Sequence, residues 1–394
     1  MNFQYDVIIV GAGPVGSTMA YHLVKQNLNV VIVEKKTYIG YPLQCAGIIS
    51  TNIHNLNELP SNIILNDVKG AYLHSKNKQL KVQKDKTVAH VIDRIAYDQF
   101  LIQRCIDCGV KVINKKVMSC DIEQGIVYLE NSEKLTSKII IGCDGYNSTI
   151  SKSMGNKQKN FNATQILVEI DGIEKYRKSN ESNDEYVDTY ITEELAPGFL
   201  WIIPIKNNLY RVGLFSDCTH KLQNGYIEKF LDENFTYEVK EKYKGFIPIF
   251  DEDNVLVKNR AMLIGDAAAQ IKPTSGGGLL MGFDACKIAI EYIVKSVDEN
   301  DINILNEYEK IFKKKYLKEI NYQQKVQKIF SMLSDDDFDY LFYKLKRNDG
   351  EKLISEYGDM DNQSILVKEF IKRGLALKII PSFFIKKYQK IFGI

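Results

Sequence analysis

The sequence Gln4-Tyr-Asp-Val-Ile-Ile-Val-Gly-Ala-Gly-Pro-Val-Gly-Ser17 decides the fold, and the chain then runs on to a second apolar stretch that ends at Glu34. Residues 7–10 and 30–33 are short runs of mainly β-branched side chains, as is typical of buried parallel strands. The segment from Pro14 to about Gln26 has the spacing of a helix. The pattern therefore predicts a βαβ unit of about thirty residues.

Three glycines of this unit, Gly11, Gly13 and Gly16, give the pattern G-x-G-x-x-G directly after the first strand. They permit, in order, a tight turn, a close approach of backbone N–H groups to a pyrophosphate, and packing of the helix on the strand. The helix that begins at Pro14 and Val15 would face the phosphates with its partially positive N-terminus. Glu34 could accept hydrogen bonds from an adenosine ribose. The glycine pattern alone is weak, but strand, helix, strand and acid together predict a dinucleotide site.

The composition restricts the other possibilities. A chain of 394 residues is too long for one ordinary core, so we expect two or three domains. The net charge of +2, from 52 basic and 50 acidic residues, gives no reason to expect a nucleic-acid partner. We expect a cytoplasmic protein, because no run approaches the roughly 18 apolar residues of a spanning helix and the N-terminus leaves no room for a signal peptide. Seven irregularly spaced cysteines fit reduced thiols, and no metal site is expected.

The strand and turn patterns divide the chain into three regions. We expect residues 1–160 and 256–300 to form a discontinuous Rossmann-like α/β domain, because a buried strand returns before Gly265. Residues 161–255 carry alternating strands within 165–214, which predicts an inserted, mostly antiparallel sheet domain and makes the fold α+β overall. The hairpin predicted at 68–83 could join that sheet. Residues 301–394 are expected to be helical.

A second glycine-rich stretch favours one dinucleotide over the others. Gly265-Asp266 follows a buried strand, and Pro273-Thr-Ser-Gly-Gly-Gly278 then leads into a helix at Leu279. A nicotinamide dehydrogenase needs only the first glycine motif. Here the Asp266 carboxylate could accept from a ribityl hydroxyl, and the amides of Gly277, Gly278 and Leu279 would point at the pyrimidine edge of a flavin. With Asp93-Arg94, these distant pieces predict FAD.

At this point the sequence resembles the FAD-dependent geranylgeranyl reductases, which share the p-hydroxybenzoate hydroxylase fold, over nearly the whole chain. The resemblance is carried by residues 11–16, Glu34, 40–47, 93–94, 142–145, 265–268 and 273–278. Two further segments, 198–204 and 332–337, are similar to the reductases rather than to the hydroxylases. Within the family, the sequence is most similar to archaeal digeranylgeranylglycerophospholipid reductases, which saturate the isoprenoid chains of ether lipids.

The resemblance implies a set of FAD contacts. These are Val15, Glu34, Cys45, Ala46, Ile48, Arg94, Met118, Asp266, Gly278 and Leu279, and the motifs add Gly11, Gly13, Pro14, Gly16, Asp144, Gly265 and Gly277. Cys45 has two interpretations. It is either a spare buried thiol, which is common for cysteine, or a group beside the isoalloxazine ring that donates a proton or positions the substrate.

The resemblance also implies an apolar slot for a prenyl chain, formed by Phe199, Trp201 and Pro204. The family pattern P-x-x-Y-x-W-x-F-P reads here as Ala196-Pro-Gly-Phe-Leu-Trp-Ile-Ile-Pro204. Phe199 therefore has no phenol hydroxyl, and Ile203 replaces a phenylalanine. Simple core packing of Trp201 is the competing interpretation.

The function predicted is the FAD-dependent saturation of isoprenoid C=C bonds in geranylgeranyl chains of ether lipids. Two alternatives remain open: a flavin monooxygenase acting on an aromatic or apolar substrate, and a flavin electron-transfer or lipid-carrier protein without chemistry of its own. No second G-x-G-x-x-G precedes a helix, so the sequence predicts no separate nicotinamide-binding domain. Ferredoxin and a transiently bound reduced nicotinamide both remain open as the electron donor. Residues 364–394 are both basic and apolar, which fits either peripheral binding to a membrane or ordinary packed helices.

Overall fold

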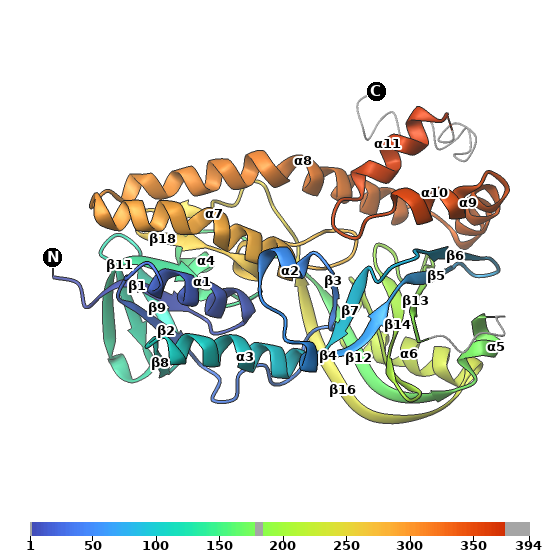
Figure 1. Cartoon of the computed structure of the whole chain (residues 1–394), viewed down its shortest axis with the longest axis horizontal. Helices are drawn as coiled ribbons and strands as arrows, with labels where there is room; N and C mark the ends of the chain where they lie inside the picture. The colour runs from blue at the N-terminus through green and yellow to red at the C-terminus, as the bar shows by residue number, and fades with distance from the viewer. Residues whose placement is uncertain (1, 178–183, 375–394) are drawn as a thin grey trace.

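The computed structural model describes residues 2–177 and 184–374. It is elongated, with one large sheet at each end and helices that run across both (Figure 1). The basic, apolar stretch at 375–394 lies outside the described residues.

The first sheet is built on the two apolar runs that open the sequence. β1 (Tyr5–Val10) lies between β2 (Val30–Glu34) and β11 (Lys134–Gly142), parallel to both. The sheet order is β17-β18-β11-β1-β2-β8, with β10 paired to β11 and β9 paired to β10. Its central strands are buried, as the apolar runs predict. The remaining strands are β8 (Lys111–Asn114), β9 (Val117–Asp121), β10 (Ile126–Leu129), β17 (Val257–Lys258) and β18 (Ala261–Leu263).

Three helices cover this sheet: α1 (Pro14–Val24), α3 (Arg94–Asp107) and α7 (Leu279–Asp298). α1 starts directly after the glycine turn and packs against both of the others. The reason for glycine is steric here: a Cβ at Gly16 would lie 2.0 Å from the carbonyl oxygen of Gly11. The strand and the helix can approach this closely only without that side chain.

The second sheet has the order β16-β12-β15-β14-β13-β5-β6. The hairpin strands β5 (Gly70–His74) and β6 (Gln79–Gln83) belong to it, because β5 pairs in parallel with β13. α6 (His220–Asn234) and the short α5 (Ile173–Arg177) pack against its outer face. The other strands are β12 (Asn160–Asp171), β13 (Tyr186–Tyr190), β14 (Phe199–Lys206), β15 (Leu209–Ser216) and β16 (Thr236–Pro248).

A small sheet and the short helix α2 (Ile53–Leu56) lie between the two large sheets (Figure 1). The sheet has the order β3-β7-β4, formed by β3 (Ile48–Ser50), β7 (Ala89–Ile92) and β4 (Ile64–Val68). A second short helix, α4 (Thr149–Ser153), packs against β9, β11 and β18 of the first half. β3 therefore places the loop that carries Cys45 between the two halves of the molecule.

The C-terminal helices form a cover over the second sheet. α8 (Asn306–Phe330) begins beside α7 and reaches the second half of the molecule, where α9 (Asp335–Arg347), α10 (Gly350–Tyr357) and α11 (Ser364–Lys372) follow (Figure 1). α9 and α10 lie against β6. Ser334 and Asp337 form a capping box at the start of α9, which stabilises this end of the helix.

Candidate functional site

One large cavity, of about 1350 Å³, runs between the first sheet, the inner face of the second sheet and the C-terminal helices. Most of the residues predicted for the site line it. They are Gly11, Gly13, Pro14, Val15, Glu34, Cys45, Ala46, Ile48, Arg94, Asp144, Phe199, Trp201, Asp266, Gly277, Gly278 and Leu279. Segments from distant parts of the sequence therefore meet around a single space.

The glycine turn opens onto one end of this cavity. A Cβ at Gly13 would meet nothing within 4 Å, so the backbone there is accessible to a ligand. α1 begins at Pro14 without a side-chain cap, and α7 begins at Leu279 in the same way. By contrast, Asp93 and Ser334 cap α3 and α9. The uncapped N–H groups of α1 and α7 form positive ends that suit an anionic ligand.

Glu34 lies at the carboxyl end of β2, where its carboxylate also braces the turn. Oε2 accepts from the backbone N–H of Ala12 at 2.7 Å, and Oε1 accepts from that of Lys36 at 2.8 Å. Each carboxylate oxygen has a second lone pair, so both bonds are compatible with acceptance from a ribose hydroxyl.

Arg94 and Asp98 form a buried ion pair on the wall of the cavity, with 3.0 Å between Nη2 and Oδ1. Burial opposes the charge of Arg94, but the neighbouring Asp98 carboxylate and Cys45 outweigh it and raise the pKa of the guanidinium. Burial is the largest influence on Asp98 and raises the pKa of its carboxyl. Arg94 thus supplies a fixed positive charge near Cys45.

Two other carboxylates, those of Asp144 and Asp266, line the cavity. Oδ1 of Asp144 is buried without a hydrogen-bond partner, while Oδ2 accepts from the backbone N–H of Thr149 at 2.7 Å. Asp266 faces the cavity beside the start of α7, and its side chain is exposed to that space. Desolvation by the surrounding protein raises the pKa of its carboxyl, with the charge of Arg94 acting in the opposite direction. Oδ1 of Asp144 therefore needs a hydroxyl or N–H donor, and Asp266 is open to a donor from a ligand.

Cys45 lies in the middle of the cavity, at a turn that several distant residues hold in place. Its Sγ accepts from the backbone N–H of Gly47 at 3.4 Å. The buried Arg211 donates from Nη1 to the carbonyl oxygens of Ala46, at 3.0 Å, and Ile92, at 3.1 Å. A Cβ at Gly47 would lie 1.9 Å from this nitrogen, so only glycine permits the contact.

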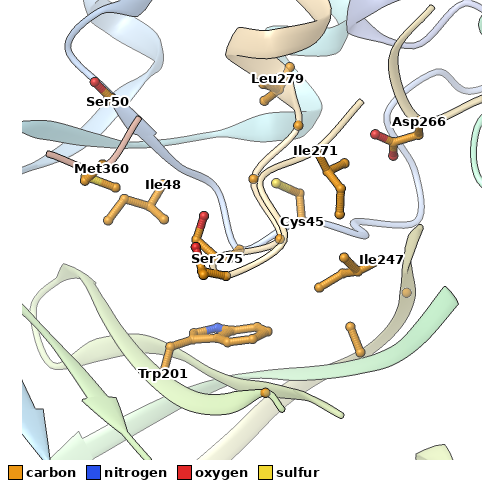
Figure 2. Close-up of a pocket in the computed structure, with 18 of the residues that line it drawn as sticks. Cys45, Ile48, Ser50, Trp201, Ile247, Asp266, Ile271, Ser275, Leu279 and Met360 are labelled. Carbon is orange, nitrogen blue, oxygen red and sulfur yellow. The ribbon is translucent and has the colours of Figure 1, made fainter. Parts of the chain in front are cut away.

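A buried amide links the Cys45 turn to the predicted apolar slot. Gln165 donates from Nε2 to the carbonyl oxygen of Cys45 at 3.3 Å, and its Oε1 accepts from Nε1 of Trp201 at 3.2 Å. Figure 2 shows Trp201 below a group formed by Cys45, Ile247 and Ile271. The indole therefore contributes its apolar face to the cavity while its one polar atom is satisfied.

The part of the cavity between the second sheet and the C-terminal helices, called the branch, has mainly apolar walls. Its sheet side includes Leu73, Leu80, Val187, Ile191 and Ile203, and its helical side includes Val326, Phe330, Phe342, Leu345, Ile354 and Phe370. Lysines line parts of the cavity wall, among them Lys69, which pairs with Glu185 at 2.5 Å. The branch suits a long hydrocarbon chain.

Four of the residues predicted for the site are absent from the cavity lining. Gly16 and Gly265 lie behind the residues that line the cavity and allow close packing there. A Cβ at Gly265 would lie 3.1 Å from the Val15 side chain. Pro204 is buried in β14 and does not reach the space. The Met118 side chain is 55% exposed on the outer surface, although its neighbour Val117 lines the cavity. A ligand in the cavity could therefore contact Met118 only through its backbone.

The sequence reasoning missed several lining groups. Gln165 and Arg211 were not singled out, although each is a polar residue among strand residues with an apolar pattern. β16 was not predicted at all, yet it contributes Tyr243 and residues 245–247 to the cavity. The sequence predicts the C-terminal helices but not that part of their apolar faces lines the cavity.

Among the described residues, no group of three or more His, Cys, Asp or Glu side chains could hold a metal ion. No helix in this part of the chain is long and apolar enough to cross a membrane.

The fold and the site define a protein of the doubly wound dinucleotide-binding class that carries a second sheet and an apolar cavity. A family model described as lycopene cyclase protein matches residues 6–339. Digeranylgeranylglycerophospholipid reductase 2 of Methanococcoides burtonii is 31% identical, over 88% of this chain and 89% of the relative. The chain belongs to the family that includes these digeranylgeranylglycerophospholipid reductases, and the resemblance predicted from the motifs is confirmed.

Other similar proteins agree with this placement. An uncharacterised protein of Methanocaldococcus jannaschii is 34% identical, over 96% of this chain and 98% of that protein. The crystal structure of a geranylgeranyl bacteriochlorophyll reductase-like protein from Thermoplasma acidophilum has a TM-score of 0.82 at 22% identity, covering 98% of this chain and 99% of that chain. The halogenase PltM in complex with phloroglucinol and FAD has a TM-score of 0.63 at 17% identity, covering 96% and 87%. These likenesses confirm the predicted α/β fold with its inserted sheet.

Proposed function

We propose that this protein is an FAD-dependent oxidoreductase that saturates isoprenoid C=C bonds in the geranylgeranyl chains of ether lipids. The observation that carries the proposal is the continuity of one cavity. Its first end has the glycine turn, the two uncapped helix starts and the unpartnered carboxylate of a dinucleotide site, and its other end is an apolar branch. A cofactor and a long hydrocarbon chain would therefore meet beside Cys45 and Trp201.

The residues present fit FAD. The first turn of α1 would hold the pyrophosphate, Glu34 the adenosine ribose, Asp266 a ribityl hydroxyl, and the start of α7 the pyrimidine edge of the flavin. The open space at Gly13 and the unpartnered Oδ1 of Asp144 support this assignment. When bound and reduced, FAD supplies a hydride, and a proton completes the addition of two hydrogens across a C=C bond.

The protein has to orient an isolated alkene, which has no carbonyl group to polarise, and to keep water away from it. The apolar walls exclude water and hold the chain extended along the branch. The Cys45 thiol is the group we assign to deliver the proton or to position the alkene. Its turn is fixed by Arg211, Gln165 and Gly47, so the thiol has a defined place.

The names of the relatives support this substrate class. The reductases of Methanococcoides burtonii and Methanocaldococcus jannaschii, at 31% and 29% identity, are named for digeranylgeranylglycerophospholipids. Lipids of this kind reside in membranes. Met360, Ile365 and Ile371 are 38%, 39% and 53% exposed near the cavity, and Lys368, Lys372 and Arg373 of the same segment are basic. We infer that this face meets an anionic membrane surface.

The electron donor and the compartment are further parts of the proposal. We propose reduced ferredoxin or a reduced nicotinamide as the donor. All seven cysteines are free in the structure, as is usual in a reducing compartment, which supports a cytoplasmic protein at the inner face of the membrane.

Turnover tests the proposed reaction. Protein loaded with FAD is reduced with dithionite in the absence of oxygen and incubated with unsaturated digeranylgeranylglycerophospholipid. The molecular mass of the lipid is then measured by mass spectrometry. We expect a gain of two hydrogens for each double bond reduced. Hydroxylated lipid that forms only with oxygen would indicate the monooxygenase, and bound but unaltered lipid would indicate the carrier.

A further inference from the structure

The loop at 272–278, which precedes α7, is closed by two backbone hydrogen bonds that Lys272 makes with the glycines at its far end. The backbone N–H of Lys272 donates to the carbonyl oxygen of Gly277 at 3.0 Å, and the Lys272 carbonyl oxygen accepts from the N–H of Gly276 at 2.8 Å. A Cβ at Gly277 would lie 3.0 Å from Cε of Lys272. The lysine stem therefore packs directly on the glycines, and Lys272 organises the loop through both its backbone and its side chain.

The Lys272 ammonium group is bound by the C-terminal region. Nζ lies 2.9 Å from Oδ1 of Asp361 and donates to the carbonyl oxygen of Met360 at 2.8 Å. The two side chains are only 12% and 22% exposed. The second carboxylate oxygen of Asp361 accepts from Nδ2 of Asn52 at 2.7 Å, so the pair also reaches the segment that follows β3.

The same region holds the next two residues of the loop. The carbonyl oxygen of Pro273 accepts from Nε2 of Gln327 in α8 at 2.8 Å. The Thr274 hydroxyl lies 2.7 Å from Oε1 of Gln363, just before α11. Three consecutive loop residues are thus fixed by side chains or backbone that come from beyond residue 320.

We propose that Lys272 and Asp361 are positioning residues that set the place of the cofactor-binding loop. This inference rests on the proposed binding of FAD. The pair holds the loop so that the amides of Gly277, Gly278 and Leu279 stay aimed into the cavity at the start of α7. Because the pair is largely buried, removing one partner leaves a charge without compensation, and the loop loses its fixed position.

The segment that holds Lys272 also belongs to the substrate branch. Met360 lines the cavity, and Figure 2 shows it beside Ile48 and Ser50. The cofactor loop and one wall of the cavity are therefore joined through two adjacent residues, Met360 and Asp361. The C-terminal region acts on the affinity for the cofactor as well as on the lipid.

The test measures the Kd for FAD by quenching of flavin fluorescence in Lys272→Met, Asp361→Asn, the double variant and the conservative variant Lys272→Arg. We expect each of the two single variants that break the pair to raise the Kd tenfold or more and the double variant to add little. Lys272→Arg keeps the positive charge and the donors for Asp361 and Met360, so its Kd should stay within threefold of the wild type. Lys138→Met is the matched control. Lys138 pairs with Asp6 at 2.8 Å, and the two side chains are 33% and 22% exposed. Lys138 belongs to β11 and takes no part in the loop, so the Kd for FAD in this variant should change less than twofold.

Hydrogen exchange in the protein without FAD gives the second measurement. Peptides that cover residues 272–280 should exchange faster in Lys272→Met and Asp361→Asn and keep the wild-type protection in Lys272→Arg. Exchange and FAD affinity that stay within twofold of the wild type in Lys272→Met and Asp361→Asn would overturn the proposal. If the wild type binds no FAD at all, the proposed function fails, and the exchange of these peptides still decides whether the pair positions the loop.

Discussion

Asp361 is a residue at which burial and charge act in opposite directions. Burial would raise the pKa of its carboxyl, but the charge of Lys272 and hydrogen bonds from Lys272, Asn52 and Ser50 outweigh it and lower the pKa. A lowered pKa means that the native state favours the ionised carboxylate. The stability gained is present above the ordinary pKa of about 3.9 and is lost as pH falls through the lower native value.

We therefore expect the difference in unfolding free energy between the wild type and Asp361→Asn to be constant from about pH 7 to pH 5. The difference should be about 1–2 kcal/mol, as for a charged hydrogen bond, and should shrink only below about pH 4. Urea unfolding at several pH values measures it. A difference that disappears near pH 6 would show that the Asp361 carboxylate is not responsible.

At the residue scale, local backbone geometry was enough to predict which residues face the cavity. Gly11, Gly13, Glu34 and Asp266 line it, because a strand, a turn and a helix fix their places over a short stretch of chain. Arg211 was not found, because its role depends on the carbonyl oxygens of Ala46 and Ile92, more than a hundred residues away.

At the scale of elements, the second sheet contains a buried charged group on the face away from the cavity. Asp188 of β13 is 1% exposed, lies 2.6 Å from Nη2 of Arg177 and 2.9 Å from Nε2 of His74, and has neighbours in sequence that face the cavity. The strand thus separates an apolar wall from a polar network.

We predict that Asp188→Ala lowers the unfolding free energy by about 3–5 kcal/mol, because it removes the carboxylate that compensates the charge of the buried Arg177 guanidinium. Urea denaturation followed by circular dichroism measures this loss. Asp171→Ala, at the exposed end of β12, is the control and should change the free energy by less than about 0.5 kcal/mol. A loss below about 1 kcal/mol in Asp188→Ala would contradict the role given to the pair.

The elements that the sequence predicted were those with a clear period. The strands within 165–214 and the βαβ unit at the start are present with shifted ends. β16 was missed because Thr236–Lys244 is mostly charged and polar with an outward-facing strand pattern, and only its pairing with β12 identifies it. That strand supplies part of the cavity wall, so the prediction of the site was incomplete in the same place.

For the molecule as a whole, the proposed cofactor site and the lipid branch occupy different parts of the cavity. A mutation can therefore impair lipid turnover without impairing FAD binding. Thr189 of β13 lines the branch, away from the glycine turns. It is the cross-strand neighbour of Trp201 in β14. We predict that Thr189→Phe narrows the branch and lowers lipid turnover tenfold or more, while the Kd for FAD changes less than twofold. Thr189→Val, which keeps the size of the side chain, should retain turnover within threefold. Equal loss of FAD binding in Thr189→Phe would show that the ends are not independent.

At this scale the sequence predicts which segments form strands and helices but not how these elements enclose a space. The C-terminal helices were predicted from their period, and their apolar faces look the same whether they pack on a core or line a cavity. Only the position of α8 to α11 over the second sheet distinguishes the two.

The most direct test of the reductase proposal follows the colour of the bound flavin without oxygen. The protein is loaded with FAD, bleached by one equivalent of dithionite, and mixed with unsaturated digeranylgeranylglycerophospholipid, with the fully saturated lipid as the control. The account predicts that the visible absorption of oxidised flavin returns with the unsaturated lipid alone, one flavin oxidised for each double bond lost. A flavin that stays bleached with both lipids, or a protein that takes up no FAD, would contradict it.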